Sequence, residues 1–226
     1  LIFALLDGTT ITDFRTGAAG GIAAKYLARK DSKVLGFVGA GKQAITQLLA
    51  LKEVFEVEEV KVWSRTISTS KSFAEKFSLE NFDIKIFESI EDVCKNSDII
   101  VTTTPSTKPL VKKEWVDEGT HINAIGADAP GKQELDEKIL IESKIVVDDY
   151  EQASHSGEIN VPLSKGVISK ENIYAELGEI VAGIKKGREN DLEITIFDST
   201  GLSIQDVSSA YYLYKKAIEN EIGKSI

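Results

Sequence analysis

The chain has 226 residues, enough for one large domain or two modest ones, and its 42% hydrophobic and 28% charged content excludes a disordered protein. Its formal net charge of −9 argues against a nucleic acid or an anionic membrane surface as partner, so local groups must hold any anionic ligand. A single cysteine excludes a disulfide framework and a cysteine metal cluster and favours a cytoplasmic location, and no apolar run reaches transmembrane length.

The chain opens on an apolar stretch without a methionine, from which we expect that an upstream part of the protein is absent. The first residues predict two strands, 2–6 and 9–12, joined by a turn at Asp7-Gly8. The alanine-rich segment that follows predicts a helix capped by Thr12 or Asp13. Its glycines allow a close approach to another element or to a ligand.

Arg15 lies at the start of this predicted helix, where a cation gains nothing from the helix dipole. Two interpretations of this placement stay open. Arg15 binds an anionic ligand, or it forms a surface salt bridge, for instance with Asp13.

The pattern that organises the chain is an apolar strand, a glycine turn and a helix, in that order. Residues 34–38 predict the strand, Gly39-x-Gly41-x-x-Ala44 follows, and apolar residues at helical spacing come next. Gly39 permits the tight turn, Gly41 lets a pyrophosphate approach the backbone, and Ala44 lets the helix pack close to the strand. The amides at the helix start then face the phosphates. The pattern therefore predicts dinucleotide binding.

Strands and helices alternate through the rest of the chain, which predicts an α/β fold with a doubly wound parallel sheet of Rossmann type. The predicted strands are 60–63, 84–87, 98–102, 120–125, 144–147 and 194–197. The predicted helices are 68–77, 90–94, 135–141, 173–184 and 203–218. In such a sheet ligands bind past the carboxyl ends of the strands, so the informative residues are those that follow each strand.

Polar residues follow two of these strands in positions suited to a cofactor. Ser64, Arg65 and Thr66 come after the second strand. An acid there usually holds the ribose of NAD, whereas an arginine accommodates the 2′-phosphate of NADP. These residues therefore favour NADP, or the use of both NAD and NADP. Thr103 and Thr104 begin a hydroxyl-rich loop that suits ribose and phosphate.

Asp128 follows the 120–125 strand, where a nicotinamide and its substrate would meet, although an aspartate there can also simply form a turn. Other arrangements of catalytic residues match this sequence less well. His121 lies inside an apolar strand and is expected in the core, whereas His155 lies in a predicted loop and is a weaker acid–base candidate. The two histidines are not at metal-ligand spacing, so no metal site is predicted.

These motifs resemble the ornithine cyclodeaminase and mu-crystallin family. The resemblance rests on residues 7–19, on Gly39–Ala44, on residues 119–136 and on residues 197–206. It covers essentially the whole chain, and the segment around Asp128 is its most specific part. Within the family, the amino-acid sequences of these motifs resemble those of the archaeal-type alanine dehydrogenases most.

The resemblance implies that Arg15 binds the substrate carboxylate and that Asp128 is the catalytic acid and base. It also implies that an upstream region supplies most of a substrate and dimerisation domain, with a catalytic lysine and a second arginine. From the glycine turn, the strand ends and the resemblance together, the expected cofactor-binding residues are Arg15, Thr16, Gly39, Ala40, Gly41, Lys42, Gln43, Ser64, Arg65, Thr66, Thr103, Thr104, Ala124, Ile125, Gly126 and Ser199.

The expected organisation is a dinucleotide-binding Rossmann domain over 31–204 and part of a second α+β domain over 1–30 and 205–226, in a homodimer. The resemblance implies reversible oxidative deamination of L-alanine to pyruvate and ammonia, with NAD, or alternatively NADP, as cofactor. Its other implied activities are ornithine cyclodeamination to proline and the role of a ketimine reductase or a non-enzymatic NADPH-binding protein like mu-crystallin. The Ser64 to Thr66 segment resembles the NADP-favouring ketimine reductases, which lack Asp128.

Overall fold

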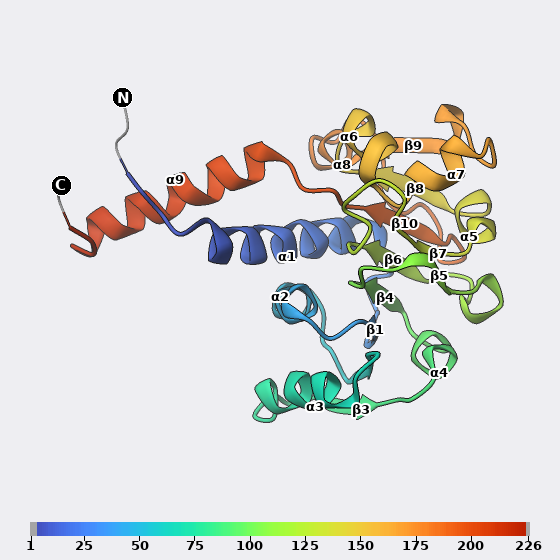
Figure 1. The fold of residues 1–226 in the computed structure, drawn as a ribbon, viewed down its shortest axis with the longest axis horizontal. Helices are drawn as coiled ribbons and strands as arrows, with labels where there is room; N and C mark the ends of the chain where they lie inside the picture. Colours follow the sequence, from blue (N-terminus) through green and yellow to red (C-terminus); the bar gives the residue numbers. More distant parts are fainter. Residues whose placement is uncertain (1–3, 225–226) are drawn as a thin grey trace.

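The computed structural model describes residues 4–224, whose strands form one large and one small parallel sheet (Figure 1). The large sheet has eight strands in the order β3-β2-β1-β4-β6-β10-β8-β9, and the small sheet pairs β5 with β7. The order reverses between β1 and β4, as in the predicted doubly wound fold, which is confirmed. The strands are β1 Val34–Val38, β2 Glu59–Trp63, β3 Asp83–Ile86, β4 Ile99–Thr102, β5 Thr107–Val111, β6 His121–Ala124, β7 Gln133–Leu135, β8 Lys144–Val147, β9 Ile173–Glu176 and β10 Thr195–Asp198.

Helices cover both faces of the large sheet. Successive strand residues alternate between the faces, so Phe37 packs with Leu48 and Phe73 on one side, whereas Val38 packs with Val93 and Ile139 on the other. The helices are α1 Gly8–Leu27, α2 Lys42–Leu51, α3 Ile67–Lys76, α4 Ile90–Cys94, α5 Glu137–Ile141, α6 Tyr150–Ser156, α7 Asn160–Ser164, α8 Leu177–Val181 and α9 Ser203–Glu219, with 3-10 turns at Lys113–Trp115 and Lys170–Asn172. Within residues 4–224, no helix combines the length and the apolar character needed to span a bilayer.

Residues 8–27 form one continuous helix, α1, where a second strand and a later helix start were expected. The side chain of Asp7 caps α1 by accepting a hydrogen bond of 2.8 Å from the amide of Thr9. The predicted strand over 9–12 and the later helix start are therefore wrong, because this aspartate cap outweighs the weak β-preference of threonine and isoleucine. The predicted strand over 2–6 lies partly outside the described residues, and its described part forms no strand.

Glycines on α1 let this helix lie directly against α2, so the close approach expected from the sequence is to another element. A Cβ atom at Gly17 would lie 2.7 Å from the carbonyl carbon of Thr46, and one at Gly20 would lie 2.7 Å from Cδ of Gln47. Larger residues would push the two helices apart. The contact therefore attaches the second half of α1 to the sheet.

Buried side chains link α2, β6 and β10 beside this contact. The amide of Asn123 donates to Oε1 of Gln47 at 3.2 Å, and its oxygen pairs with Nε2 of His121 at 2.9 Å. The other ring nitrogen of His121 pairs with the hydroxyl of Thr195 at 2.9 Å. Burial lowers the pKa of His121 to about 3, so the ring is neutral. The expectation of a core histidine is confirmed.

α9 leaves the sheet and lies beside the first turns of α1 (Figure 1). Ile204, Val207 and Tyr211 on this helix are 63%, 63% and 61% exposed. α1 also contacts β6 and β10, so this helix divides its contacts between α9 and the sheet. The division of the chain into a Rossmann domain and part of a second domain stays a prediction.

Three further segments differ from the predictions. Residues 173–184, expected as one helix, divide into the edge strand β9 and the short α8, because the β-branched and aromatic start of the segment pairs with β8. The helix expected from residue 135 begins at Glu137, where Asp136 caps it. His155 lies in α6 and not in a loop.

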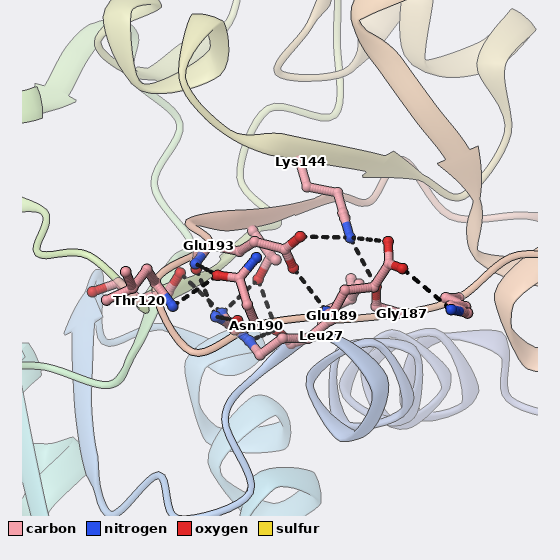
Figure 2. A network of polar contacts seen from close by, with 11 residues as sticks. Leu27, Thr120, Lys144, Gly187, Glu189, Asn190 and Glu193 are labelled. Carbon is pink, nitrogen blue, oxygen red and sulfur yellow. Dashed lines mark hydrogen bonds and ion pairs between the residues drawn. The ribbon is translucent and has the colours of Figure 1, made fainter.

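A network of polar contacts lies at the amino edge of the sheet, where the segment after α8 crosses this edge (Figure 2). Lys144 forms ion pairs with Glu189 and Glu193 at 3.2 and 2.9 Å. Arg188 donates a hydrogen bond of 2.7 Å to the carbonyl oxygen of Leu27, the last residue of α1. The network therefore joins the end of α1 to β8 on the side of the sheet opposite to the strand ends that bind ligands.

Cys94, the only cysteine of the chain, ends α4 and is 1% exposed. Its burial among apolar side chains raises the pKa of the thiol to about 12. The native thiol is therefore protonated at neutral pH.

Gly17→Ala should lower the free energy of unfolding by about 1–3 kcal/mol, because the new methyl group would meet the backbone of Thr46 and separate α1 from α2. Urea unfolding followed by circular dichroism measures the change. Gly8→Ala is a matched control in the same helix, since a Cβ atom there meets nothing within 4 Å, and its effect should stay within about 1 kcal/mol. An equally small effect at Gly17 would show that the helix contact tolerates a side chain.

Candidate functional site

A crevice of about 340 Å³ opens at the carboxyl edge of the sheet, between the loops that follow β1, β2 and β4. This is the point where the strand order reverses. Eight of the predicted cofactor-binding residues line it: Gly39, Ala40, Gly41, Ser64, Arg65, Thr66, Thr103 and Thr104. Pro105 and Ser106, which complete the hydroxyl-rich loop predicted to suit ribose and phosphate, line it as well, whereas sequence reasoning did not single out Trp63, Thr69 and Leu110.

The glycine turn has the geometry that a pyrophosphate needs. Gly39 leaves β1 with a φ of +111°, which other residues rarely adopt, and a Cβ atom there would lie 2.6 Å from the hydroxyl of Thr103. Gly41 is the N-cap of α2, and no side chain caps that helix. A Cβ atom at Gly41 would meet no protein atom within 4 Å, so open space lies over the start of α2. Helix amides facing open space form an anion site.

The loop after β2 contributes the only charged side chain among the described residues that line the crevice, Arg65. Its neighbour Ser64 is fixed by hydrogen bonds of 2.8 Å to the carbonyl oxygen of Thr66 and 2.6 Å to the hydroxyl of Ser70. Arg65 itself is exposed. An exposed cation at this position, without a lining carboxylate, can face a phosphate.

The hydroxyl of Thr103 is buried at the crevice and has no hydrogen-bond partner among residues 4–224. Buried polar atoms in folded proteins are almost always paired. A polar group of a bound ligand would supply the missing partner. Together with the glycine turn and Arg65, this hydroxyl fits a dinucleotide.

The other predicted cofactor-binding residues lie outside the lining of this crevice. Lys42 is exposed, Gln43 donates a hydrogen bond of 3.2 Å to Asp13, and Thr16 is buried in α1. The four residues that end or follow β6 and β10 are buried or half-buried: Ala124, Ile125, Gly126 and Ser199.

Arg15 is held at the carboxyl edge by the start of α9. Its Nε donates to Asp206 at 3.0 Å and its Nη1 to Gln205 at 3.2 Å. Gly201, with a φ of +81°, makes room for the guanidinium, because a Cβ atom there would lie 2.8 Å from Nη2. Arg15 therefore does form a salt bridge, with Asp206 and not Asp13 as partner, and its binding of an anionic ligand stays a prediction. Arg15 also lines a second cavity of about 820 Å³ between α1 and α9, most of whose lining is apolar.

Asp128 lies in the loop after β6, as its position in the sequence predicted. Its carboxylate is 59% exposed and forms an ion pair with Lys132, which sequence reasoning had not singled out. The amide of Asp128 also donates a hydrogen bond of 3.1 Å to the carbonyl of Gly126, so the residue does form a local turn. An exposed carboxylate in this position can accept a proton from water.

Buried carboxyl groups underlie the same edge. Glu134, Glu158 and Asp198 are each 0% exposed. Burial raises the pKa of all three, and that of Asp198 to about 7. Nothing in the local sequence pattern marked these three carboxyl groups as buried.

Asp198 should make the stability of the protein depend on pH. Its pKa in the folded chain lies near 7, above the ordinary value of 3.8, so between these values the folded chain binds a proton more tightly than the unfolded chain does. The contribution of Asp198 to stability therefore falls as the pH rises from about 4 to about 7, by at most about 1.4 kcal/mol per pH unit. Asp198→Asn should flatten this slope, because an amide does not titrate and its oxygen can still accept from the amide of Ile159.

Urea unfolding between about pH 5 and pH 8 measures the slope. Asp31→Asn is the control, because the side chain of Asp31 is 84% exposed and this variant should keep the slope of the unaltered protein. The same slope in Asp198→Asn would show that the buried carboxyl group ionises at its ordinary pKa.

Comparisons with known proteins agree with this site. The family model described as ornithine cyclodeaminase/mu-crystallin family matches residues 1–221. Alanine dehydrogenase from Archaeoglobus fulgidus is 56% identical over 223 residues, which are 99% of this chain and 69% of that protein.

Two solved structures share the fold over nearly the whole chain. An archaeal alanine dehydrogenase dimer with bound NAD superposes with a TM-score of 0.94 at 56% identity, covering 97% of this chain and 68% of that one. The delta(1)-pyrroline-2-carboxylate reductase of Thermococcus litoralis, in complex with NADH and L-proline, gives a TM-score of 0.96 at 47% identity, covering 99% and 70%. The resemblance seen in the sequence is therefore confirmed, and the chain belongs to the ornithine cyclodeaminase/mu-crystallin family.

Proposed function

We propose that this protein is an NAD-dependent alanine dehydrogenase. The reaction converts L-alanine, water and NAD⁺ reversibly to pyruvate, ammonium, NADH and a proton. The observation that carries the proposal is the 56% identity to the Archaeoglobus fulgidus alanine dehydrogenase across 99% of the chain. The crevice at the reversal of strand order, with its glycine turn, supports a nicotinamide dinucleotide as cofactor.

Different residues of the crevice lining would bind different parts of the cofactor. The start of α2 and Gly41 would bind the pyrophosphate, Arg65 would face the adenosine ribose, and Thr103 would pair with a polar group of the ligand. When bound, the nicotinamide supplies the hydride acceptor.

Arg15 would bind the substrate carboxylate. Asp206 and Gln205 accept hydrogen bonds from its Nε and Nη1, and no described residue accepts one from Nη2, which leaves this nitrogen for the carboxylate. A planar guanidinium that is held on its other side is well oriented for this contact.

Asp128 would be the general base that activates the attacking water. When the hydride leaves Cα, the substrate becomes an imine, and the carboxylate of Asp128 takes a proton from the water that attacks the imine carbon. The resulting adduct releases ammonia and gives pyruvate. Lys132, which pairs with Asp128, would orient this carboxylate.

A second candidate function is the reduction of delta(1)-pyrroline-2-carboxylate to proline. It is favoured by the TM-score of 0.96 and 47% identity to the Thermococcus litoralis enzyme. The two functions share hydride transfer at a carbon that bears nitrogen, and they differ in the origin of the imine. In the reductase the substrate is already a cyclic imine, so no water adds to it and no ammonia is released.

The full-length protein, with the upstream region that the resemblance implies, separates these functions when it is incubated with NAD⁺ and single L-amino acids. NADH and ammonia should form from L-alanine in equal amounts, whereas NADH formation from L-proline without ammonia would favour the reductase. Turnover of neither amino acid would contradict both functions. We further propose a homodimer like the archaeal structure, which equilibrium sedimentation tests through a mass of twice the chain.

Asp128→Asn should lower kcat by about 10²–10⁴-fold and leave the affinity for NADH nearly unchanged, because the amide keeps the shape of the side chain but cannot take a proton from water. Steady-state kinetics and NADH fluorescence titration measure the two quantities. Glu142→Gln is the matched control, since Glu142 is 58% exposed and also pairs with a lysine, and it should leave both unchanged. A near-normal kcat in Asp128→Asn would show that Asp128 is not the general base and only forms a turn.

Arg65→Ala should weaken NADP⁺ binding about tenfold or more while changing NAD⁺ binding much less, because only NADP⁺ carries a 2′-phosphate for the guanidinium. Fluorescence titration with the two reduced cofactors compares the losses in one protein sample. Equal losses would show that Arg65 does not contact the 2′ position.

A further inference from the structure

Glu134 joins two loops that follow different strands of the large sheet. Its Oε1 accepts hydrogen bonds from the amide and the hydroxyl of Thr104, at 2.6 and 2.7 Å, in the loop after β4. Its Oε2 accepts from the amide of Gly126 at 2.9 Å, in the loop after β6. One carboxyl group therefore spans the distance between both loops.

The two loops are packed as closely as the backbone permits. A Cβ atom at Gly126 would lie 2.5 Å from the amide nitrogen of Thr104 and 2.6 Å from Oε2 of Glu134, so only glycine fits. The backbone ladder between the strands continues as far as the amide of Gly126, which lies 3.1 Å from the carbonyl of Thr102. Beyond that point Glu134 extends the connection to Thr104.

Glu134 is itself fixed by a second buried carboxyl group. Both oxygens of Glu158 accept from the amide of Glu134 at 3.0 Å, and one accepts from the amide of Leu135 at 2.7 Å. The segment of Glu158 is held in turn by Asp198, which accepts from the amide of Ile159 at 3.0 Å. Three carboxyl groups thus connect the ends of β10, β6 and β4 in series.

This arrangement is costly for a purely structural connection. The groups that face Glu134, Glu158 and Asp198 are one another, Asp148, backbone amides and threonine hydroxyls, and no cation forms an ion pair with them in the described part of the chain. Burying carboxyl groups without a cation destabilises a fold, and a neutral amide would make most of the same contacts at lower cost. A carboxylate, unlike an amide, has two oxygens that can both accept hydrogen bonds.

We propose that Glu134 is a positioning residue, which sets the spacing of the Thr104 and Gly126 loops so that the nicotinamide half of the cofactor meets Asp128. Thr104 lines the cofactor crevice, and Gly126 lies two residues before Asp128. The inference rests on the proposed function for the identity of the ligand between these loops.

Glu134→Gln tests this role with little change in size. Its amide group can still accept at one end, but at the other end it presents N–H groups to an N–H donor, so the two loops separate. The affinity for NADH should fall about tenfold, as for the loss of a buried hydrogen bond, whereas the affinity for ADP-ribose, which lacks the nicotinamide, should fall by less than about threefold. Fluorescence titration and calorimetry measure the two affinities.

Asp98→Asn is the matched control. Asp98 also accepts two backbone amides, those of Lys33 and Val34 at 2.8 and 2.9 Å, but at the amino edge of the sheet. This variant should lose thermal stability without changing either affinity. Equal losses of NADH and ADP-ribose affinity in Glu134→Gln, or unchanged affinities, would reduce Glu134 to a structural residue.

The titrations need no substrate, so they separate this inference from the proposed function. An unaltered protein that binds NADH but oxidises no alanine would contradict the proposed function, and the titration of Glu134→Gln would still decide the positioning role. Normal alanine turnover together with unchanged NADH affinity in the variant would contradict the positioning role alone. An unaltered protein without NADH affinity would contradict both.

Discussion

The close contact between α1 and α2 determines where the parts of the candidate site lie. Because Gly17 and Gly20 carry no side chain, the helix that bears Arg15 rests against the helix that begins at the glycine turn. The same contact leaves the first turns of α1 beside α9, whose start holds the guanidinium of Arg15. The packing that stabilises the fold is therefore also the packing that brings an arginine to the carboxyl edge of the sheet.

Three buried carboxyl groups underlie the carboxyl edge, although the proposed cofactor is an anion. Glu134, Glu158 and Asp198 accept hydrogen bonds from backbone amides, and burial raises the pKa of each carboxyl group. The anion site itself depends on the uncapped start of α2 and on Arg65. A chain with a net charge of −9 can thus bind a dinucleotide through a few local groups.

The sheet was predictable because each buried strand is a short apolar run between helices with their own periodicity. The glycine turn was predictable because its residues are required by backbone geometry, as the φ of Gly39 shows. The start of α1 and the 173–184 segment were not, because a cap and an edge pairing outweighed local propensity there. The role of Glu134 was not predictable, because it depends on contacts with loops eight and thirty residues away in the sequence, which a local sequence pattern does not reveal.

The burial of Cys94 has a practical consequence for handling the protein. A protonated thiol inside the core reacts neither with oxidants nor with alkylating reagents, because only the exposed thiolate is an effective nucleophile. Burial therefore protects this thiol in the folded chain. Any slow labelling of this single thiol would report transient opening of the core around α4, so one reagent and a mass spectrometer suffice to follow local unfolding in the native protein.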